Sequence, residues 1–306
     1  MSKEKSIKHQ RRILVLLDAH AILHRAFHAL PSFTSPQGEP TGALYGFTAV
    51  LLKIIRELKP DYLAACYDLP EPTFRHIAYE KYKIQRPKMA DELVPQIEKS
   101  REILSVFKIP IFEHPGFEAD DILGAIVDQL KNEQDLQIII ASGDLDTLQL
   151  VKNDEVLVYT LRKGVQDVLL YNEAAVKERF GFGPKLLPDF KGLRGDPSDN
   201  IIGVPGIGDK TAKVLVQRFG SIENIYKALK QDKLAFEKAG IKPRIIKILE
   251  DHKEDALFSK TLAEIRRDAP IAFSLENAAW RGKFDASKAK DIFQRLGFKT
   301  LIDRLP

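Results

Sequence analysis

Three short apolar stretches, each followed by an aspartate, constrain the fold of this chain most. They are Ile13–Leu17 before Asp18, Asp61–Tyr67 before Asp68, and Gln137–Ser142 before Gly143 and Asp144. Continuous apolar runs of this length are typical of central strands in a parallel sheet. Helical segments such as Gly42–Leu58 separate them along the chain. This alternation predicts an α/β fold with a mainly parallel central sheet and helices on both faces.

The aspartates at the strand ends predict a shared site. In open α/β sheets, ligands bind at the carboxyl ends of the strands, so we expect Asp18, Asp68 and Asp144 to gather on one rim. Each aspartate could instead cap the turn that follows it, which is a common role for this residue. Three strands with the same ending favour the shared site.

Further carboxylates surround the third of these strands. The segment FEADDILGAIVDQL predicts a helix that opens with Glu118, Asp120 and Asp121, and the strand end adds Asp144 and Asp146. A helix N-terminus tolerates an acid or two through its dipole. These five carboxylates, which lie within residues 118–146, repel one another if they are crowded together, unless a positive charge keeps them ionised. Because hard oxygen ligands favour Mg²⁺ or Mn²⁺, the stretch predicts a site for such a cation.

The segment from about residue 71 to residue 100 is basic and aromatic. It leads to a helix predicted to begin near Asp91, and between Phe74 and Lys88 only Glu80 is acidic. Basic groups interleaved with rings suit single-stranded nucleic acid, which offers phosphates to neutralise and bases to stack. A solvated loop whose rings pack on the protein explains the composition equally well. The basic and aromatic residues are Arg75, Lys81, Lys83, Arg86, Lys88, Phe74, Tyr79 and Tyr82.

A glycine-rich turn follows two more aspartates, Asp196 and Asp199, and leads into a helix predicted over Thr211–Phe219. Glycines let the backbone approach a ligand closely, and the amides of a helix start form an anion site. Such a turn could hold a phosphate backbone without reading its sequence; a plain helix–turn–helix connection is the alternative. The candidate binding residues are Gly203, Gly206, Gly208, Lys210, Thr211 and Lys213.

The remaining sequence gives few signals of chemistry. A net charge of +4 is a weak indication of a polyanionic partner. Residues 1–12 predict a basic tail, either frayed or in contact with nucleic acid. The chain lacks a long apolar span and signal-peptide features, so we expect a cytoplasmic protein without membrane contact. Cys66 is expected in the core, Pro270–Leu275 as a strand, and residues 286–298 as a closing helix.

Seven motifs in order carry a resemblance to a known family. They are LLDAHAILHRAFHAL, TGALYGF, YDLPEPTFRH, YKIQRP, GFEADD, SGDLDTLQL and GDPSDNIIGVPGIGDKTA. From about Ile13 to its last residues, the chain resembles the 5′ nuclease domain found at the N-terminus of bacterial DNA polymerase I, in the flap endonuclease family. The resemblance implies a PIN-like flap-endonuclease fold with a helical arch and a helix-three-turn-helix DNA-binding subdomain.

The resemblance also implies roles for individual residues. A first metal group falls on Asp18, Asp68, Glu118 and Asp120, with Asp121 beside it, and a second on Asp144, Asp146 and Asp199, with Asp196 in support. Residues 71–100 would form the arch through which a single-stranded 5′ end passes. Arg25, Lys83 and Arg86 match basic positions that steer or hold the scissile phosphate, and a monovalent cation such as K⁺ is implied near the glycine turn. Ile77, Tyr67 and His24 depart from the usual residues, which affects details of the arch.

These inferences predict a division of the chain and a reaction. We expect a catalytic domain over residues 13–185, a helical DNA-binding subdomain over 186–268 with its helix-three-turn-helix at 199–220, and a C-terminal segment over 269–306. The expected reaction is hydrolysis of phosphodiester bonds at 5′ ends or 5′ flaps of duplex DNA, assisted by two divalent ions roughly 4 Å apart. A monomer that is linked to, or works with, a DNA polymerase is expected. The alternatives are a branched-DNA clamp without catalysis and a PIN-like ribonuclease.

Overall fold

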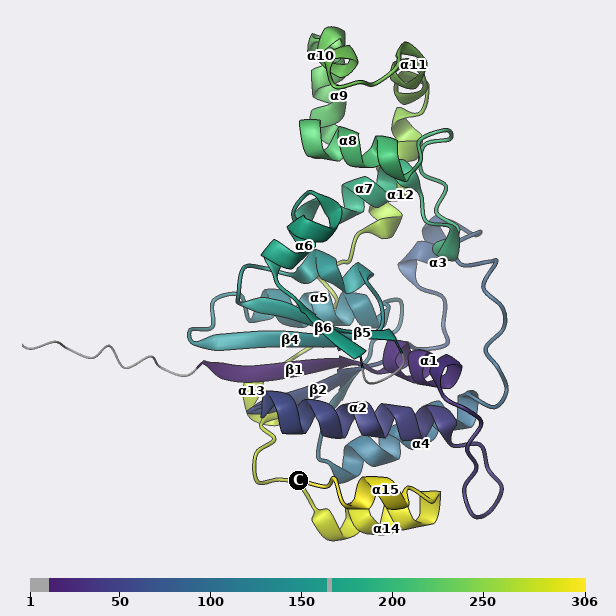
Figure 1. Cartoon of the computed structure of the whole chain (residues 1–306), viewed down its shortest axis with the longest axis vertical. Coiled ribbons are helices and arrows are strands. Elements are labelled where there is room, and N and C mark those ends of the chain that lie inside the picture. Colours follow the sequence, from purple (N-terminus) through teal and green to yellow (C-terminus); the bar gives the residue numbers. More distant parts are fainter. Residues whose placement is uncertain (1–10, 164–166) are drawn as a thin grey trace, which may run out of the picture.

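The computed structural model describes residues 11–163 and 167–306, and its centre is a six-stranded sheet (Figure 1). The predicted basic tail lies outside the described residues except for its last two, and Arg12 already belongs to the first strand. The strands lie in the order β3-β2-β1-β4-β5-β6. Their bounds are β1 Arg12–Asp18, β2 Tyr62–Cys66, β3 Ile111–Phe112, β4 Leu136–Ser142, β5 Val156–Lys163 and β6 Asp167–Tyr171.

The mainly parallel sheet predicted from the sequence is confirmed. β1 to β5 pair in parallel, and only the edge strand β6 is antiparallel among the described strands. The register places Asp18 beside Cys66 of β2, and Leu17 beside Ala141 of β4. The three predicted strands are β1, β2 and β4, and their carboxyl ends meet on one rim as expected. β3, β5 and β6 were not predicted.

Helices cover both faces of the sheet because both faces of its central strands are apolar. Val15 and Leu17 of β1 point into one core with α1 (Ala19–Ala29), α2 (Gly42–Leu58) and α4 (Val94–Val106). Leu14 and Leu16 point into the other core with α5 (Ala119–Gln129). Cys66 is fully buried in this second core, as predicted. No helix in the described part of the chain is long and apolar enough to cross a membrane.

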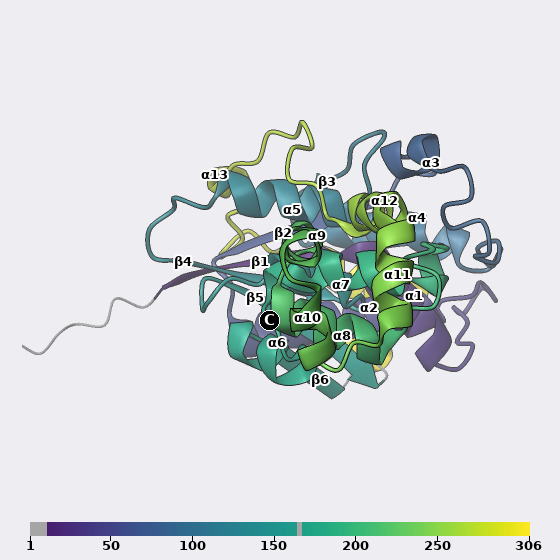
Figure 2. The same ribbon diagram turned by 90° about the horizontal axis from the view of Figure 1, so that it is seen from above.

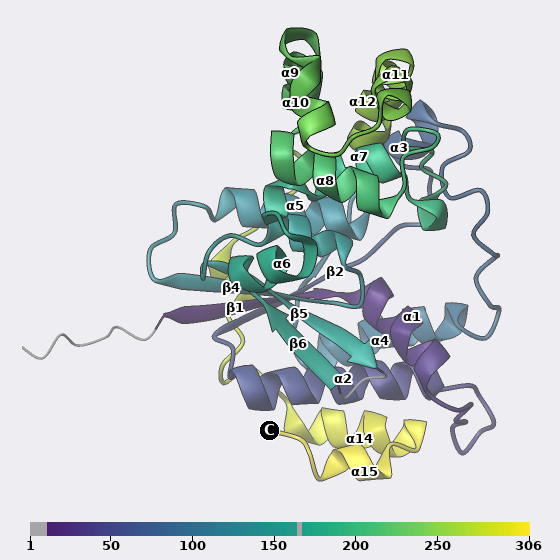
Figure 3. The ribbon, with the colours of Figure 1, turned by 45° about the horizontal axis from the view of Figure 1, so that its top comes forward.

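A helical region stands above the α5 face of the sheet. Figures 1 and 3 show it rising to two arms, one made by α9 and α10 and the other by α11 and α12. The predicted helix after the glycine turn is α8, which begins two residues earlier than expected, at Asp209. The elements are α6 Glu173–Phe180, η2 Pro184–Leu186, α7 Leu187–Arg194, η3 Pro197–Asp199, α8 Asp209–Phe219, α9 Ile222–Gln231, α10 Lys233–Lys238, α11 Pro243–Asp251 and α12 Lys253–Ala263.

The predicted strand Pro270–Leu275 is wrong. The chain is irregular there and then forms the short helix α13 (Leu275–Ala278). Its backbone pairs with a side chain instead of a strand, since the amide group of Gln129 donates to the carbonyl of Ile271 and accepts from the N–H of Phe273. The closing helix is confirmed as α14 (Ala286–Leu296), and α15 (Lys299–Ile302) follows it on the α2 and α4 side of the sheet.

The arch segment begins with the short helix α3 (Phe74–Ala78) and ends in α4. Figures 1 and 2 both place α3 near α12, and the chain then returns along the edge of the molecule to α4. α4 begins at Val94 rather than near Asp91, with Pro95 in its first turn, where the missing N–H costs no helical hydrogen bond. Residues 71–100 therefore connect the helical region to the sheet face that carries α1 and α4.

Candidate active site

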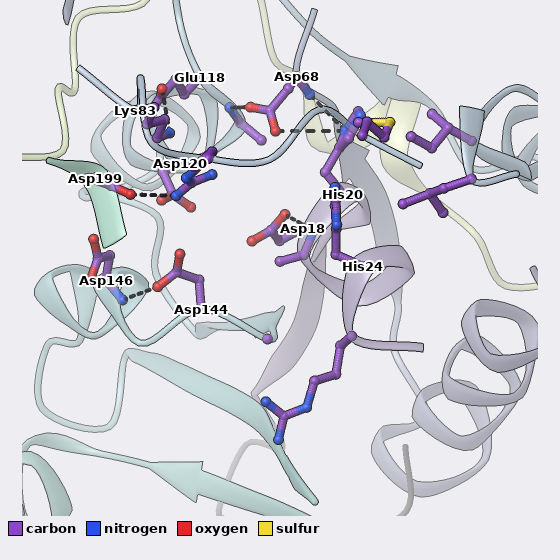
Figure 4. A pocket seen from close by; sticks show the side chains of 18 of the residues that line it. Asp18, His20, His24, Asp68, Lys83, Glu118, Asp120, Asp144, Asp146 and Asp199 are labelled. Atoms are coloured by element: carbon purple, nitrogen blue, oxygen red, sulfur yellow. Dashed lines mark hydrogen bonds and ion pairs between the residues drawn. The ribbon is translucent and has the colours of Figure 1, made fainter. Parts of the chain in front are cut away.

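A cavity of about 1270 Å³ lies at the carboxyl ends of the central strands. Figure 4 shows the labelled carboxylates facing this space from several elements. The arch segment and α1 contribute other parts of the wall. Glu98 of α4 also lines the cavity, together with the carboxylates predicted from the sequence, which are Asp18, Asp68, Glu118, Asp120, Asp144, Asp146 and Asp199.

Asp18 and Asp68 are placed by the ends of β1 and β2. Asp18 is also the N-cap of α1, where it accepts from the N–H of Ala21 (3.1 Å) and from the hydroxyl of Ser142 (2.6 Å). Asp68 accepts from the N–H of Ala119 (2.7 Å) at the start of α5. Both interpretations of the strand-end aspartates therefore apply to Asp18, because its carboxylate caps α1 and also lines the cavity.

The start of α5 sorts its three carboxylates into different environments. Glu118, the N-cap, and Asp120 line the cavity. Asp121 does not: it is fully buried, and it forms two hydrogen bonds with the guanidinium of Arg75 at 2.7 and 2.8 Å. It also accepts from the N–H groups of Glu118 and Arg266. The structure therefore gives Asp121 a structural role, and we remove it from the candidate metal ligands.

A lysine that was not predicted as a site residue connects two aspartates of the second carboxylate group. Asp146, on the 3₁₀ turn η1 (Asp146–Leu150), and Asp196 both pair with the ammonium group of Lys191 on α7. Asp196 does not line the cavity, so it acts on the site through Lys191. Asp144 accepts from the N–H of Asp146 (2.9 Å), which fixes the turn after β4. The only sign of this ion pair in the sequence is that Lys191 lies shortly before Asp196.

The carboxylates of the cavity differ in how well protein charges compensate them. Burial, with Asp68 and Asp144 nearby, raises the pKa of Asp18 to about 7. Burial, with Asp18, Asp144 and Asp146 nearby, raises the pKa of Asp120 well above its usual value. Burial also raises the pKa of Asp146 to about 6, although Lys191 opposes the rise. For Glu118, burial favours the neutral form, but Lys83 and Arg75 outweigh it and lower the pKa.

These residues fit a divalent cation by the chemistry of their donors. None of the described residues donates a hydrogen bond to the half-buried carboxylate of Asp120, and its raised pKa marks a carboxylate without a local counter-ion. Among the described residues, no group of three or more His, Cys, Asp or Glu side chains is arranged closely enough to form a complete metal-binding site. The assignment of the carboxylates to two ions therefore stays a prediction.

The arch residues occupy positions that the sequence could not distinguish. Lys83 reaches Glu118 (Nζ–Oε1, 2.6 Å) and Arg86 reaches Asp199 (Nη2–Oδ1, 2.5 Å), so both predicted basic residues enter the site. Tyr82 is buried, and its hydroxyl donates to Asp199 (3.2 Å) and Glu118 (3.3 Å). Its ring is not available to stack on a base, in contrast to the prediction.

Arg75 also differs from the prediction. Its side chain is 3% exposed and donates to Asp121, Glu118 and two backbone carbonyls near the end of α12. It fixes α3 to α5 and α12 instead of contacting a phosphate. Lys81 and Lys88 are exposed as a DNA contact requires, and Arg25 lines the cavity from α1.

The glycine turn is present before α8. Gly203 and Gly206 have φ angles of +69° and +87°, which favour glycine. A side chain on Gly203 would meet the backbone of Gly195 at 2.2 Å, so this glycine serves packing. A Cβ atom on Gly208 would meet no atom within 4 Å, so the backbone there is open to a ligand. Lys210 is exposed at the start of α8, Thr211 is half-buried, and Lys213 pairs with Asp209 at 2.9 Å.

Histidines on α1 were not among the predicted site residues. His20, His24 and His28 line the cavity, and burial lowers the pKa of His20 and of His24. The N–H of Asp68 donates to Nδ1 of His20 (3.1 Å), so this nitrogen accepts a hydrogen bond and carries no proton. The helical spacing of the three histidines was the signal in the sequence.

Asp18→Asn is expected to stabilise the chain progressively as pH rises, when divalent ions are chelated. The folded-state pKa of about 7 lies above the ordinary value of 3.8, so ionisation of Asp18 reduces stability as pH rises between these values. The free energy of unfolding of the variant, relative to wild type, should increase by about 3 kcal/mol from pH 5 to pH 8 in denaturant titrations. Asp128→Asn on α5 is the control. A difference independent of pH would contradict the shift.

The fold and the site together define a class: an α/β protein with a carboxylate-lined cavity, an arch with basic residues, and a helical region with a glycine turn. Residues 13–181 match the family described as 5′-3′ exonuclease, N-terminal resolvase-like domain. Residues 182–286 match the family described as 5′-3′ exonuclease, C-terminal SAM fold. The chain belongs to the 5′-3′ exonuclease family and is a 5′ nuclease, a phosphodiester hydrolase.

Curated relatives agree with this family. DNA polymerase I of Caldicellulosiruptor bescii is 43% identical over 295 residues, which are 95% of this chain and 33% of that protein. DNA polymerase I of Bacillus caldotenax is 39% identical over 295 residues, 96% of this chain and 32% of that protein. The chain spans about a third of the length of these curated relatives.

Solved structures support the fold. T5 5′-exonuclease, in a structure described as having bound divalent zinc ions, has a TM-score of 0.66 and 20% identity, covering 93% of this chain and 100% of that one. The catalytic core of Rad2 in complex with DNA substrate has a TM-score of 0.58 and 15% identity, covering 97% and 94%. The likeness to both is one of fold.

Proposed function

We propose that the chain cleaves 5′ ends and 5′ flaps of duplex DNA, as a 5′-3′ exonuclease and flap endonuclease, with two divalent ions in the carboxylate cavity. Removal of primers and repair of DNA are the processes that such an activity serves. One observation carries the proposal: seven of the carboxylates predicted as metal ligands line one cavity whose arch side supplies Lys83 and Arg86. An acidic surface alone would repel a phosphodiester, whereas cations held between carboxylates attract it.

The carboxylates would hold the ions in two groups. Asp18, Asp68, Glu118 and Asp120 would form the first group, and Asp144, Asp146 and Asp199 the second, with Lys191 and Asp196 orienting Asp146. When bound, divalent ions supply a water of lowered pKa and stabilise the departing 3′ oxygen. Mg²⁺ and Mn²⁺ are the ions that such oxygen donors prefer.

The basic residues would bind and orient the scissile phosphate. Lys83 and Arg86 already point into the cavity, where they pair with Glu118 and Asp199. A phosphate and its cations would take over these two partners, so both side chains could donate to phosphate oxygens and stabilise the charge of the transition state. Arg25 would contact the strand from α1. No histidine is needed as a general base.

The remaining parts of the proposal concern the partners. Exposed Lys81 and Lys88 would contact the single strand, and the glycine turn with Gly206, Gly208 and Lys210 would hold the duplex backbone, with K⁺ as its monovalent cation. The predicted division into a catalytic domain, a DNA-binding subdomain and a C-terminal segment is part of the proposal. So are a monomeric state, a cytoplasmic location, and work with a DNA polymerase in the same or another chain.

A labelled 5′-flap duplex distinguishes the proposal from its rivals. In the presence of Mg²⁺, the chain should release the flap as a product whose size places the cut at or near the junction, and a chelator should prevent this. A branched-DNA clamp would retard the duplex in a gel and leave it intact. A PIN-like ribonuclease would cut an RNA flap of the same sequence and spare the DNA flap.

Lys83→Ala is expected to slow cleavage with little change in DNA affinity. Removal of one donor to a developing charge costs about 10²-fold in rate, whereas one phosphate contact among many contributes little to affinity. Single-turnover rates on the flap substrate and dissociation constants in Ca²⁺ would be measured. Lys81→Ala, two residues away and exposed, is the control and should retain the rate. Weaker binding with an unchanged rate would show that Lys83 only holds the DNA.

A further inference from the structure

The arch meets the second carboxylate group at a junction of two segments. We define the arch turn as residues 79–86 and the aspartate loop as residues 196–202. The backbone N–H of Lys83 donates to the carbonyl of Asp199 (2.9 Å). The guanidinium of Arg86 donates to the carbonyl of Ser198 (3.4 Å) as well as to Asp199. The two segments are more than a hundred residues apart in the sequence, so only the folded chain brings them together.

Asn200 supplies a contact that the proposed chemistry does not use. Its side-chain amide donates to the carbonyl of Lys81 (Nδ2–O, 2.8 Å). The same carbonyl accepts from the N–H of Ile84 (3.2 Å), which closes the arch turn. Asn200 therefore holds a carbonyl that closes part of the arch turn, two residues before Lys83.

The backbone of Asn200 is arranged to make this contact. It follows the 3₁₀ turn η3 with φ +57° and ψ +33°. Asparagine is among the few residues with a side chain that adopt this left-handed conformation readily. Lys83 on the other side of the junction also has a positive φ, of +56°. Such conformations persist only where surrounding contacts hold them.

The junction connects two parts of the site. The aspartate loop contains Asp196 and Asp199, and it continues into the turn formed by Gly203 and Gly206. On the arch side, Tyr82 is buried against this loop, and Lys83 extends from the turn to Glu118 at 2.6 Å. A shift of the arch turn on the loop would therefore move Lys83 relative to the carboxylates.

We propose that Asn200 is a positioning residue, which seats the arch turn on the aspartate loop so that Lys83 and Arg86 reach the cavity. It acts through the carbonyl of Lys81 and does not touch the reacting atoms. This inference rests on the proposed function, because the reaction that Lys83 and Arg86 would assist is the proposed cleavage of DNA. The seating itself is a property of the folded chain and can be measured without cleavage of DNA.

Limited trypsin digestion of the full chain measures the seating. The arch carries trypsin sites at Lys81, Lys83 and Lys88, whereas Pro87 protects the bond after Arg86. Asn200→Gly keeps the left-handed backbone and removes the side-chain donor. Because loss of one hydrogen bond makes local opening of the arch turn easier, trypsin should cleave the arch about tenfold faster. Asn200→Asp is isosteric, lacks the donor and should reproduce this effect. Asn153→Gly, at another left-handed asparagine (φ +46°), is the matched control.

Kinetics then separate positioning from general stability. With a 5′-flap substrate, Asn200→Gly should lower the single-turnover rate at saturating enzyme about tenfold, with unchanged affinity for a duplex without a flap. Trypsin digestion like that of wild type in both Asn200 variants would overturn the proposal. So would a loss of duplex affinity equal to the loss of rate. If the wild-type chain cleaves no flap but the digestion result holds, the proposed function fails and the seating stands.

Discussion

Asp120→Asn is expected to reduce the single-turnover rate of flap cleavage on the order of 10³-fold, because a lost cation ligand forfeits several kcal/mol of charge stabilisation and each 1.36 kcal/mol is a factor of ten. Asp120 lines the cavity, and its pKa is raised well above the usual value by burial and by Asp18, Asp144 and Asp146. The substitution removes negative charge beside a polyanion, so affinity for the flap substrate in a chelator should be retained or increased.

The same substitution should also stabilise the chain when divalent ions are absent. A carboxylate whose pKa is raised in the folded chain lowers stability as pH rises above its ordinary pKa. The melting temperature of Asp120→Asn in a chelator at neutral pH should therefore exceed that of wild type. Asp128→Asn lies at the other end of α5, where its partner is the exposed Lys131, and should change neither property. Cleavage by Asp120→Asn at the wild-type rate would exclude this carboxylate from the site.

Arg75→Ala is expected to lower the free energy of unfolding by about 3–5 kcal/mol, because it leaves a buried carboxylate without its partner. Asp121 is fully buried and both of its oxygens bind the guanidinium, at 2.7 and 2.8 Å. Arg75 also donates to the carbonyls of Leu262 and Glu264, at 2.9 and 2.7 Å, which would lose these donors. Denaturant titration in a chelator would measure the change.

A double substitution and an exposed arginine control this result. Arg75→Met with Asp121→Leu removes both charges and should be more stable than Arg75→Ala, since two apolar groups leave no unpaired charge. Arg281→Ala removes a guanidinium whose side chain is 62% exposed and pairs with Asp61, and should cost less than about 1 kcal/mol. If Arg75→Ala unfolds like Arg281→Ala and loses DNA affinity, the DNA contact predicted from the sequence is right.

The sequence predicted the parts of the fold that are marked by continuous apolar runs. β1, β2 and β4 are buried on both faces, and each ends near an aspartate, so both strand and rim were evident. β3 has only two residues, and β6 lies at the edge with exposed Leu170, so neither has a full apolar pattern. The apolar pattern of residues 270–275 suggested a strand. The side chain of Gln129 forms hydrogen bonds with the backbone there, in place of a neighbouring strand.

The partners of individual charges could not be predicted from the sequence. Arg75 and Lys83 lie in one basic segment, yet the structure buries the first against Asp121 and directs the second into the cavity. Likewise Glu118 faces the cavity and Asp121 does not, although they are one turn apart on the same helix. The choice depends on which side of α5 meets the segment that follows α12, where Arg266 contacts Asp121. Only the packing of segments distant in sequence decides this.

Counting bound Mn²⁺ by electron paramagnetic resonance tests the central claim most directly. Wild-type chain with an uncleavable flap duplex should bind two ions that the same duplex alone does not, and Asp120→Asn and Asp199→Asn should each lose an ion from a different group. Asp128→Asn should retain both. If wild type binds no Mn²⁺ beyond that of the duplex, or if Asp120→Asn and Asp199→Asn both retain two ions, the carboxylate cavity is not a two-ion site.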